Sequence, residues 1–328
     1  MRSYLLKFTL IISVLNIICW DVLAEDFQIK HADSLEADKE QIFIKGNVLI
    51  NYKDAILEAP LGSIESDSNG EPSKAIFTGR AKLKLKDRKI EADKITISIN
   101  NKTIYAEGNT ISQLKDKKNN FIIINSDFQE LYWNGEDANA MGNMKTSYID
   151  TMVNSDEAKI IYKNKKPNQA VFYSNNNESA NLVQPTNITS AKEFIFDINT
   201  RDFEAIGNVI STIWPDKTKP AAEQDPILLN TDNLFIDNAS GIITAKSKHN
   251  NKVKLSYQET KGESLETYLH RNKATGKPEK IIFKGNANVT QNDKELSSEE
   301  VIFNFADKKL TSNTQTNIRP KTVIFKND

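Results

Sequence analysis

The chain of 328 residues has few of the residues on which many catalytic and metal-binding proteins depend. It contains one cysteine, three histidines, nine prolines and only 12 glycines. A single cysteine excludes an internal disulfide framework and a cysteine-based zinc site. So few glycines and prolines exclude collagen and most low-complexity classes. With 43 basic against 44 acidic residues the formal charge is −1, which argues against nucleic-acid binding through counterion release.

Known catalytic motifs are also missing from the chain. His31, His249 and His270 lie far apart, and none belongs to an HExxH pattern. No two glycines are spaced as G-x-G, and neither a Walker loop nor a GxSxG elbow occurs. These absences argue against a histidine-based metal site and against nucleotide-binding or GxSxG-type hydrolase chemistry, and we expect no cofactor or metal. Abundant carboxylates leave a glycosidase pair open at this point.

The N-terminus has the pattern of an export signal. Arg2 and Lys7 precede an apolar run of 13 residues, FTLIISVLNIICW, which is too short to span a membrane as a helix. Val22 and Ala24 then place small residues before a cleavage point. We predict a cleaved signal peptide over residues 1–24, with an uncleaved anchor as the alternative. Cys19 lies inside this leader, so the exported chain would contain no cysteine.

Two short phrases recur along the remaining chain. The first is an apolar residue, any residue, Ala, Ser or Thr, and often Asp, as in LEADKEQIFI from Leu35 and IEADKITISI from Ile90. The second is Gly followed by Asn or Arg, which we expect to open a strand. It occurs at Gly46-Asn47, Gly79-Arg80, Gly108-Asn109, Gly142-Asn143, Gly207-Asn208 and Gly285-Asn286. Both phrases have spacings near 33 residues, which indicates a repeat architecture.

Apolar residues within the repeats alternate with polar ones, the period of a half-buried strand. Turn residues separate the strands, so the sequence predicts an all-β sandwich, jelly roll or solenoid. We expect one module over residues 25–165 and a more divergent one over 166–328, either separate or continuous. The polar stretch 164–187 is the candidate linker or long loop, and residues 214–226 form a second loop.

Two sets of polar residues have alternative interpretations. Aspartates of the first phrase (Asp38, Asp93, Asp127, Asp156 and Asp232) could bind calcium, but we favour turn formation, since an aspartate side chain bonds the backbone locally. Arg80, Lys82, Lys84 and Lys86, followed by Arg88 and Lys89, form either a solvated strand face or a patch for an anionic headgroup.

The segments HADSLEADKEQIFIKGNVLINYKDAILEAP and FTGRAKLKLKDRKIEADKITISI resemble the LptA/OstA lipopolysaccharide-transport family. The resemblance covers about residues 29–110 and extends more weakly to Tyr162. It implies an elongated, antiparallel half-open β-jelly roll, built here from repeats of about 33 residues. It also implies a periplasmic, non-catalytic carrier that shields lipopolysaccharide acyl chains between the inner and outer membranes. The implied partners are lipopolysaccharide or a related glycolipid and other β-jelly-roll proteins or further copies, joined by edge strands.

An apolar groove would meet the physical need of such a carrier, because each methylene moved into water costs about 0.8 kcal/mol. The residues predicted to line it are Ile42, Ile44, Val48, Ile50, Phe77, Leu83, Leu85, Ile95 and Ile97. They could equally fill an ordinary sandwich core. A candidate edge strand lies at residues 317–326, where Val323, Ile324 and Phe325 favour β structure. Two other functions stay open: an LptC-like anchored component, and a parallel β-helix acting as a carbohydrate-active enzyme or adhesin.

Overall fold

The computed structural model describes residues 27–38, 40–133, 137–175, 178–216, 218–248, 251–312 and 321–324. The predicted leader, with Cys19, lies outside the described residues, as does most of the segment 317–326. The chain divides into two compact units. Unit 1 holds the described residues through Lys115 together with Phe121–Gly142. Unit 2 holds Asp116–Asn120 and the described residues from Asn143 onward.

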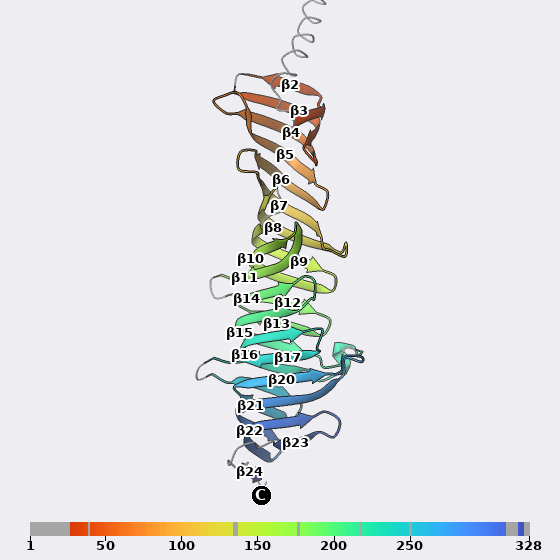
Figure 1. Ribbon diagram of the computed structural model, residues 1–328, viewed down its shortest axis with the longest axis vertical. Helices are drawn as coiled ribbons and strands as arrows, with labels where there is room; N and C mark the ends of the chain where they lie inside the picture. The colour runs from red at the N-terminus through yellow and green to blue at the C-terminus, as the bar shows by residue number, and fades with distance from the viewer. Residues whose placement is uncertain are drawn as a thin grey trace, which may run out of the picture. The chain divides into compact units, whose positions relative to one another are not determined.

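Unit 1 is a series of antiparallel strands, most of them joined by short turns (Figure 1). Its strands are β1 (Phe27–His31), β2 (Ser34–Ala37), β3 (Gln41–Tyr52), β4 (Ala55–Ser66), β5 (Pro72–Lys84), β6 (Arg88–Ser98), β7 (Thr103–Lys115) and β8 (Phe121–Tyr132). Strand β9 (Ala138–Tyr148) begins in this unit and ends in unit 2.

Unit 2 continues the same kind of structure with shorter strands between the long ones. Its strands are β10 (Thr151–Lys163), β11 (Lys166–Tyr173), β12 (Ala180–Gln184), β13 (Asn187–Ala191), β14 (Glu193–Asp197), β15 (Phe203–Ile213), β16 (Ile227–Asp237), β17 (Ile242–Lys246), β18 (Val253–Tyr257), β19 (Thr260–Ser264), β20 (Glu266–Arg271), β21 (Pro278–Gln291), β22 (Lys294–Asn304), β23 (Lys309–Ser312) and β24 (Lys321–Ile324). A short 3₁₀ helix, η1 (Ala221–Glu223), lies in the loop before β16.

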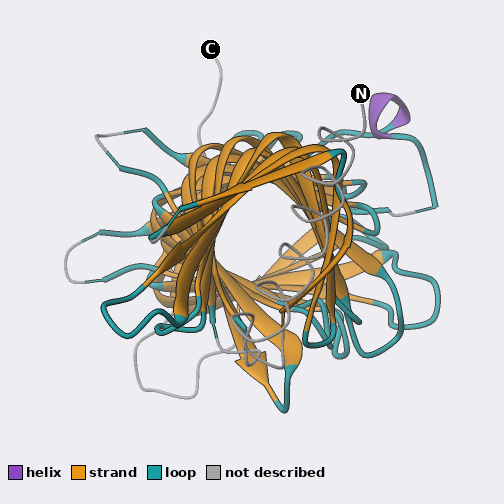
Figure 2. Cartoon of the chain, turned by 90° about the horizontal axis from the view of Figure 1, so that it is seen from above, coloured by secondary structure: helices purple, strands orange, loops and turns teal. Residues whose placement is uncertain are grey.

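The predicted all-β, antiparallel class is confirmed. Strands make up most of both units, and loops project outward from them (Figure 2). The described neighbouring strands pair antiparallel, for example β4 with β5 and β21 with β22. This pairing contradicts the parallel β-helix alternative. The polar stretch 164–187 is not the predicted linker, because β11 and β12 occupy much of it and pair with β10.

The Gly-Asn phrase lies in the middle of long strands, so the expectation that it opens a strand is wrong. Gly46 and Asn47 have φ values of 74° and 47°, and Gly108 and Asn109 have 74° and 45°. Two successive residues in the left-handed region bend the strand, and the pairing register shifts at the same point. Each phrase therefore forms a corner that divides one strand into two halves.

Aspartates of the first phrase support these corners from the preceding strand. Asp93 of β6 accepts a hydrogen bond from Asn109 Nδ2 at 2.7 Å. A Cβ atom added to Gly108 would lie 2.7 Å from Asp93 Oδ2, so any larger residue there would displace the aspartate side chain. Only Asp38 matches the predicted local turn, accepting the backbone N–H groups of Glu40 and Gln41 at 2.9 and 2.8 Å.

The remaining aspartates also act between strands rather than within one turn. Asp127 of β8 lies against Gly142 in the same way as Asp93 lies against Gly108. Asp156 accepts the backbone N–H of Asn175 at 2.7 Å, and Asp232 accepts that of Lys248 at 2.7 Å. The turn interpretation is therefore wrong for Asp93, Asp156 and Asp232, because their partners lie 16 to 19 positions further along the chain.

The two halves of the bent strands form two layers with an apolar core between them. In unit 2, the first half of β15 pairs with β14 and the second half with β13, so the ladder divides at the corner. The ring of Phe283, from the first half of β21, lies against Gly262 of β19, which pairs with the second half. The layers of unit 2 are therefore in direct contact.

Candidate functional site

The predicted groove residues lie on the inner faces of unit 1. Ile44, Ile50, Phe77 and Ile95 are fully buried, and Val48, Leu83 and Ile97 are at most 2% exposed. Leu85 is 9% exposed and Ile42 is half-buried. The alternation thus assigned the inward side of these strands correctly. Their role in binding lipid stays a prediction.

Neighbouring side chains and backbone fill the space around these residues. Phe77 of β5 pairs with Gly62 of β4, and its ring carbons lie 3.1 Å from the position that a Cβ atom of Gly62 would take. Glycine at position 62 thus makes room for the phenylalanine ring. Phe77 itself is fully buried.

The basic residues of the candidate headgroup patch lie on the outer face of β5 and on the turn that follows it. Arg80, Lys82, Lys84 and Lys86 are exposed. Lys82 pairs across the ladder with Glu58 and Glu91, and Arg80 Nη2 lies 4.0 Å from Glu91 Oε2. These glutamates offset part of the positive charge near Arg80, where the row begins at the corner of β5.

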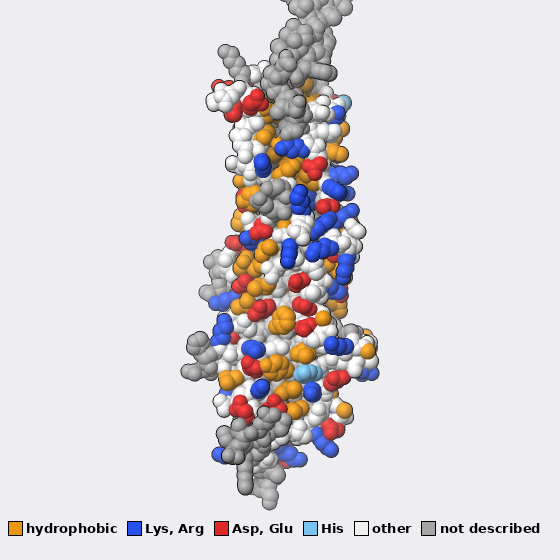
Figure 3. Space-filling model, viewed as in Figure 1, with side chains coloured by type: hydrophobic (Ala, Val, Ile, Leu, Met, Phe, Trp, Pro, Cys, Tyr) orange, Lys and Arg blue, Asp and Glu red, His pale blue; other side chains and the backbone are white. Residues whose placement is uncertain are grey.

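Positive charge concentrates at the turn end of the same row. Lys84 lies directly opposite Lys89, a like-charge pair that destabilises a sheet unless an anion or water screens it. Arg88, counted with this row from the sequence, is 9% exposed and therefore does not belong to the surface patch. Figure 3 shows lysine and arginine side chains gathering along one side of the molecule. The outer surface of unit 1 can therefore attract anions.

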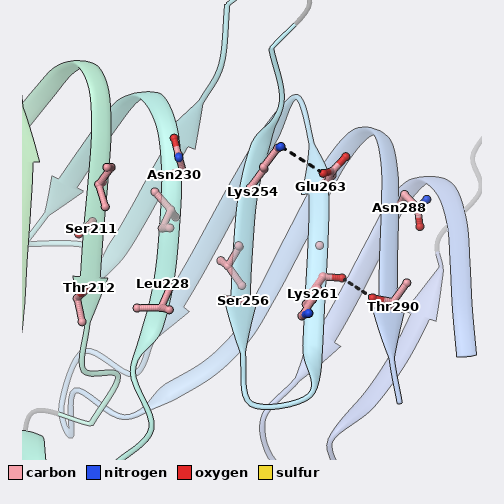
Figure 4. A pocket seen from close by; sticks show the side chains of 14 residues that line it. Ser211, Thr212, Leu228, Asn230, Lys254, Ser256, Lys261, Glu263, Asn288 and Thr290 are labelled. Carbon is pink, nitrogen blue, oxygen red and sulfur yellow. Dashed lines mark hydrogen bonds and ion pairs between the residues drawn. The ribbon is translucent and has the colours of Figure 1, made fainter. Parts of the chain in front are cut away.

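Unit 2 carries a trough of about 530 Å³ that sequence reasoning missed. It lies across the outer face of strands β15, β16, β18, β19 and β21 (Figure 4). Its lining includes two exposed apolar side chains, Ile210 at 59% and Leu228 at 49%, and the basic residues Lys254 and Lys261. The sequence feature that could have revealed the trough is the presence of apolar residues at outward-facing positions of these strands, where the alternation predicts polar residues.

A second hollow of about 410 Å³ lies at the corner formed by Gly207 and Asn208. Lys192 occupies here the position that Asp93 takes at the Gly108 corner. Lys248 and Asp232 complete the charged lining. The hollow therefore mixes both signs of charge.

The described histidines and acidic side chains were candidates for a metal site. No group of three or more His, Cys, Asp or Glu side chains in that part of the chain is placed to hold a metal ion. His31 lies 3.5 Å from Asp33, His270 lies on β20, and His249 falls outside the described residues. Burial lowers the pKa of His270, and Lys280 adds to that effect.

A buried polar contact in unit 2 connects a turn to β9. Asp116 accepts the backbone N–H groups of Lys118 and Asn120 at 2.8 and 2.7 Å. Tyr148 Oη lies 2.7 Å from Asp116 Oδ2 and 3.0 Å from the carbonyl oxygen of Ile198. Burial opposes ionisation of Asp116, but the hydrogen bonds from Tyr148, Asn120 and the backbone outweigh it and lower the pKa of Asp116. Burial and this contact raise the pKa of Tyr148.

Comparison with known proteins finds similarity among solved structures only. No family model matches the sequence, and no curated protein matches it. The chain is similar to a crystal structure of LptH, described as the LptA homologous periplasmic component of the conserved lipopolysaccharide transport device from Pseudomonas aeruginosa. The two are 11% identical, with 55% of this chain and 81% of that chain covered and a TM-score of 0.17. A TM-score this low carries no argument about the function of this chain. Within the described ranges, no helix is long and apolar enough to cross a membrane.

Proposed function

We propose that this chain is a non-catalytic, exported lipid carrier that shields lipopolysaccharide acyl chains between the inner and outer membranes. The observation that carries the proposal is the apolar inner face, which repeats on both halves of the bent strands. In unit 1, Ile44, Phe77 and Ile95 line one half, and Ile50 and Leu83 line the other. The likeness of residues 29–110 to the LptA/OstA phrases supports the same function.

The energetics of acyl chains supports an apolar conduit of this kind. About ten methylenes exposed to water cost on the order of 8 kcal/mol, at about 0.8 kcal/mol each. Ladder hydrogen bonds run within each layer, whereas apolar side chains join the layers. Separating the layers would therefore break apolar contacts between them but leave the hydrogen bonds between strands intact. An inserted acyl chain would replace the apolar contacts that were lost.

Partners follow from the same proposal. The ligand is lipopolysaccharide or a related glycolipid, and Arg80, Lys82, Lys84 and Lys86 are candidates to contact its anionic headgroup. Strand β24 pairs with β22 and exposes Val323 at 48%, so a similarly folded protein or a second copy could add to this region by strand pairing. The periplasm is the proposed compartment, reached through the predicted leader.

Site-specific photo-crosslinking tests the inner face directly. A diazirine analogue of leucine, close to leucine in size, would replace either Leu83 or Leu61. Leu83 is 1% exposed on the inner face, whereas Leu61 on β4 is 47% exposed on the outer face. We expect lipopolysaccharide to crosslink to position 83 and not to position 61.

Circular dichroism of both labelled proteins controls for folding. Equal crosslinking at the two positions would indicate nonspecific adhesion. A folded protein that crosslinks at neither position would contradict the proposed carrier function. N-terminal sequencing of the exported protein would separately distinguish a cleaved leader, with a start at Glu25, from an LptC-like anchor.

A further inference from the structure

The outer face of unit 2 carries a row of paired residues across five strands, four of them apolar and the fifth Thr212. Met152 of β10 pairs with Val183 of β12, and Val183 pairs with Ile188 of β13. Ile188 pairs with Thr212 of β15, which pairs with Leu228 of β16. Met152 and Ile188 are 55% and 42% exposed. We call this row, together with the adjacent Ile210, the outer apolar row.

The outer apolar row runs into the trough, which holds two cationic side chains beyond it. Continuing the ladder, Leu228 pairs with Ser256 of β18, and Ser256 pairs with Lys261 of β19. Lys254 lies two residues before Ser256 on β18, opposite Asn230 and Glu263. Figure 4 shows Leu228 and both lysines around the same hollow.

The lining at this end of the trough carries more cationic than anionic groups. Among the described residues that line it, Lys254 and Lys261 are basic and Glu263 is the only acid, and Glu263 Oε1 lies 3.9 Å from Lys254 Nζ. Lys261 is exposed, and the side chain of Thr290 contacts its carbonyl oxygen rather than its ammonium group. Asn230 and Ser256 add polar groups, and Asn288 Nδ2 donates to Oε1 of Glu295, a carboxylate beside the trough, at 2.7 Å. One end of the surface is therefore apolar, and the lining of the other end is polar and carries both lysines.

The dimensions fit a chain-like ligand. Neighbouring strands lie about 4.8 Å apart, so the four steps from Met152 to Leu228 span about 19 Å. Two further steps, about 10 Å, reach Lys261. The trough volume of about 530 Å³ is within the range of about 300–1,000 Å³ typical of small-molecule sites.

We infer that this outer surface of unit 2 is a binding site for an anionic single-chain amphiphile. Its hydrocarbon chain lies along Ile210 and Leu228 towards Ile188, and its phosphate or carboxylate contacts Lys254 and Lys261. The site is separate from the inner face of unit 1, so each assignment can fail without the other.

Calorimetric titration with dodecyl phosphate, below its micelle-forming concentration, tests the inference on the full exported chain. We expect Leu228→Ser to weaken binding by about tenfold, because one large apolar contact is lost. Phe235→Ser is the matched control. Phe235 is 42% exposed on the same strand β16, but lies outside the trough. It should bind as the unchanged protein does.

A charge reversal provides the second variant, at a position exposed enough to leave folding intact. Lys261→Glu should weaken dodecyl phosphate binding by about tenfold and strengthen binding of dodecyltrimethylammonium. Inorganic phosphate and dodecyl maltoside separate the two parts of the ligand, and each should bind at least tenfold more weakly than dodecyl phosphate.

Three results would overturn the inference. The first is absence of dodecyl phosphate binding, and the second is an equal loss in Leu228→Ser and Phe235→Ser. The third is binding of inorganic phosphate as tight as that of dodecyl phosphate, which would indicate an anion site only. Sedimentation of the same variants identifies an alternative occupant. If Leu228→Ser abolishes self-association and no amphiphile binds, the row is an interface between copies of the chain.

Discussion

The corner at Gly108 provides the sharpest test of how the sequence bends its strands. Replacing Gly108 with alanine places a Cβ atom on a residue whose φ is +74°. For an L-residue the left-handed region costs about 1–2 kcal/mol. The new atom would also lie 2.7 Å from Asp93 Oδ2 and 3.0 Å from Asp93 Cβ, closer than side chains tolerate. Asp93 must therefore move.

Movement of Asp93 has a second energetic consequence. Its Oδ2 atom accepts a hydrogen bond from Asn109 Nδ2 at 2.7 Å, and a typical hydrogen bond contributes about 0.5–1.5 kcal/mol. Together the two effects predict that Gly108→Ala lowers the free energy of unfolding by about 2–3 kcal/mol. Urea unfolding followed by circular dichroism measures this change.

Gly70→Ala is the matched control for backbone conformation. Gly70 has a φ of +83°, but no atom lies within 4 Å of the position its Cβ would take. Gly70→Ala should lower the free energy of unfolding only by the cost of the left-handed backbone conformation, about 1–2 kcal/mol. If the two substitutions lower the free energy of unfolding equally, the contact with Asp93 does not stabilise the corner, and the reasoning is refuted.

Three further predictions concern the core, a buried carboxylate and the chain end. Leu83→Asp should lower the free energy of unfolding by several kcal/mol because Leu83 is 1% exposed, whereas the outward Lys84→Asp should be nearly neutral. If Leu83→Asp unfolds as the unchanged protein does and crosslinks less lipid, the residue lines an open groove instead. Asp116 has a lowered pKa, so its contribution to stability is present above about pH 4 and is lost as the pH falls through its folded-state pKa. Asp116→Asn should lower the free energy of unfolding at pH 7 by about 1–3 kcal/mol and make that free energy less dependent on pH in the acid range. An unchanged dependence of the free energy of unfolding on pH would contradict this. Deleting residues 317–328 should reduce concentration-dependent association in light scattering without unfolding the rest, and a strict monomer before deletion would contradict edge pairing.

Sequence periodicity alone determined which side of the long strands faces inward. Phe77, Leu83, Ile95 and Ile97 alternate with polar residues, and burial of one face makes a shift by one residue costly. The all-β class followed from the same alternation and from the turn residues between strands, whereas antiparallel pairing was implied by the resemblance to the LptA/OstA family. The sequence placed Arg88 in the exposed basic row, but its side chain is buried. The turn at residues 85–87 interrupts the alternation of buried and exposed positions, so the pattern of β5 does not predict which side of β6 faces inward.

Tertiary structure decided what the recurrent phrases do. Gly-Asn reads locally as a turn, because both residues favour positive φ, yet Gly108 and Asn109 bend a strand whose pairing continues on both sides. The role of Asp93 depends on a partner 16 residues away in sequence, so no local pattern reveals it.

The outer apolar row likewise depended on the register between strands. Leu228 and Lys261 are 33 positions apart, and only the pairing of β16 with β18 and of β18 with β19 places them on one surface. Pairing geometry is fixed by packing of the whole unit rather than by the composition of either strand. The alternation of each strand thus predicts which side is buried, whereas the surface that the exposed sides form together requires the three-dimensional structure.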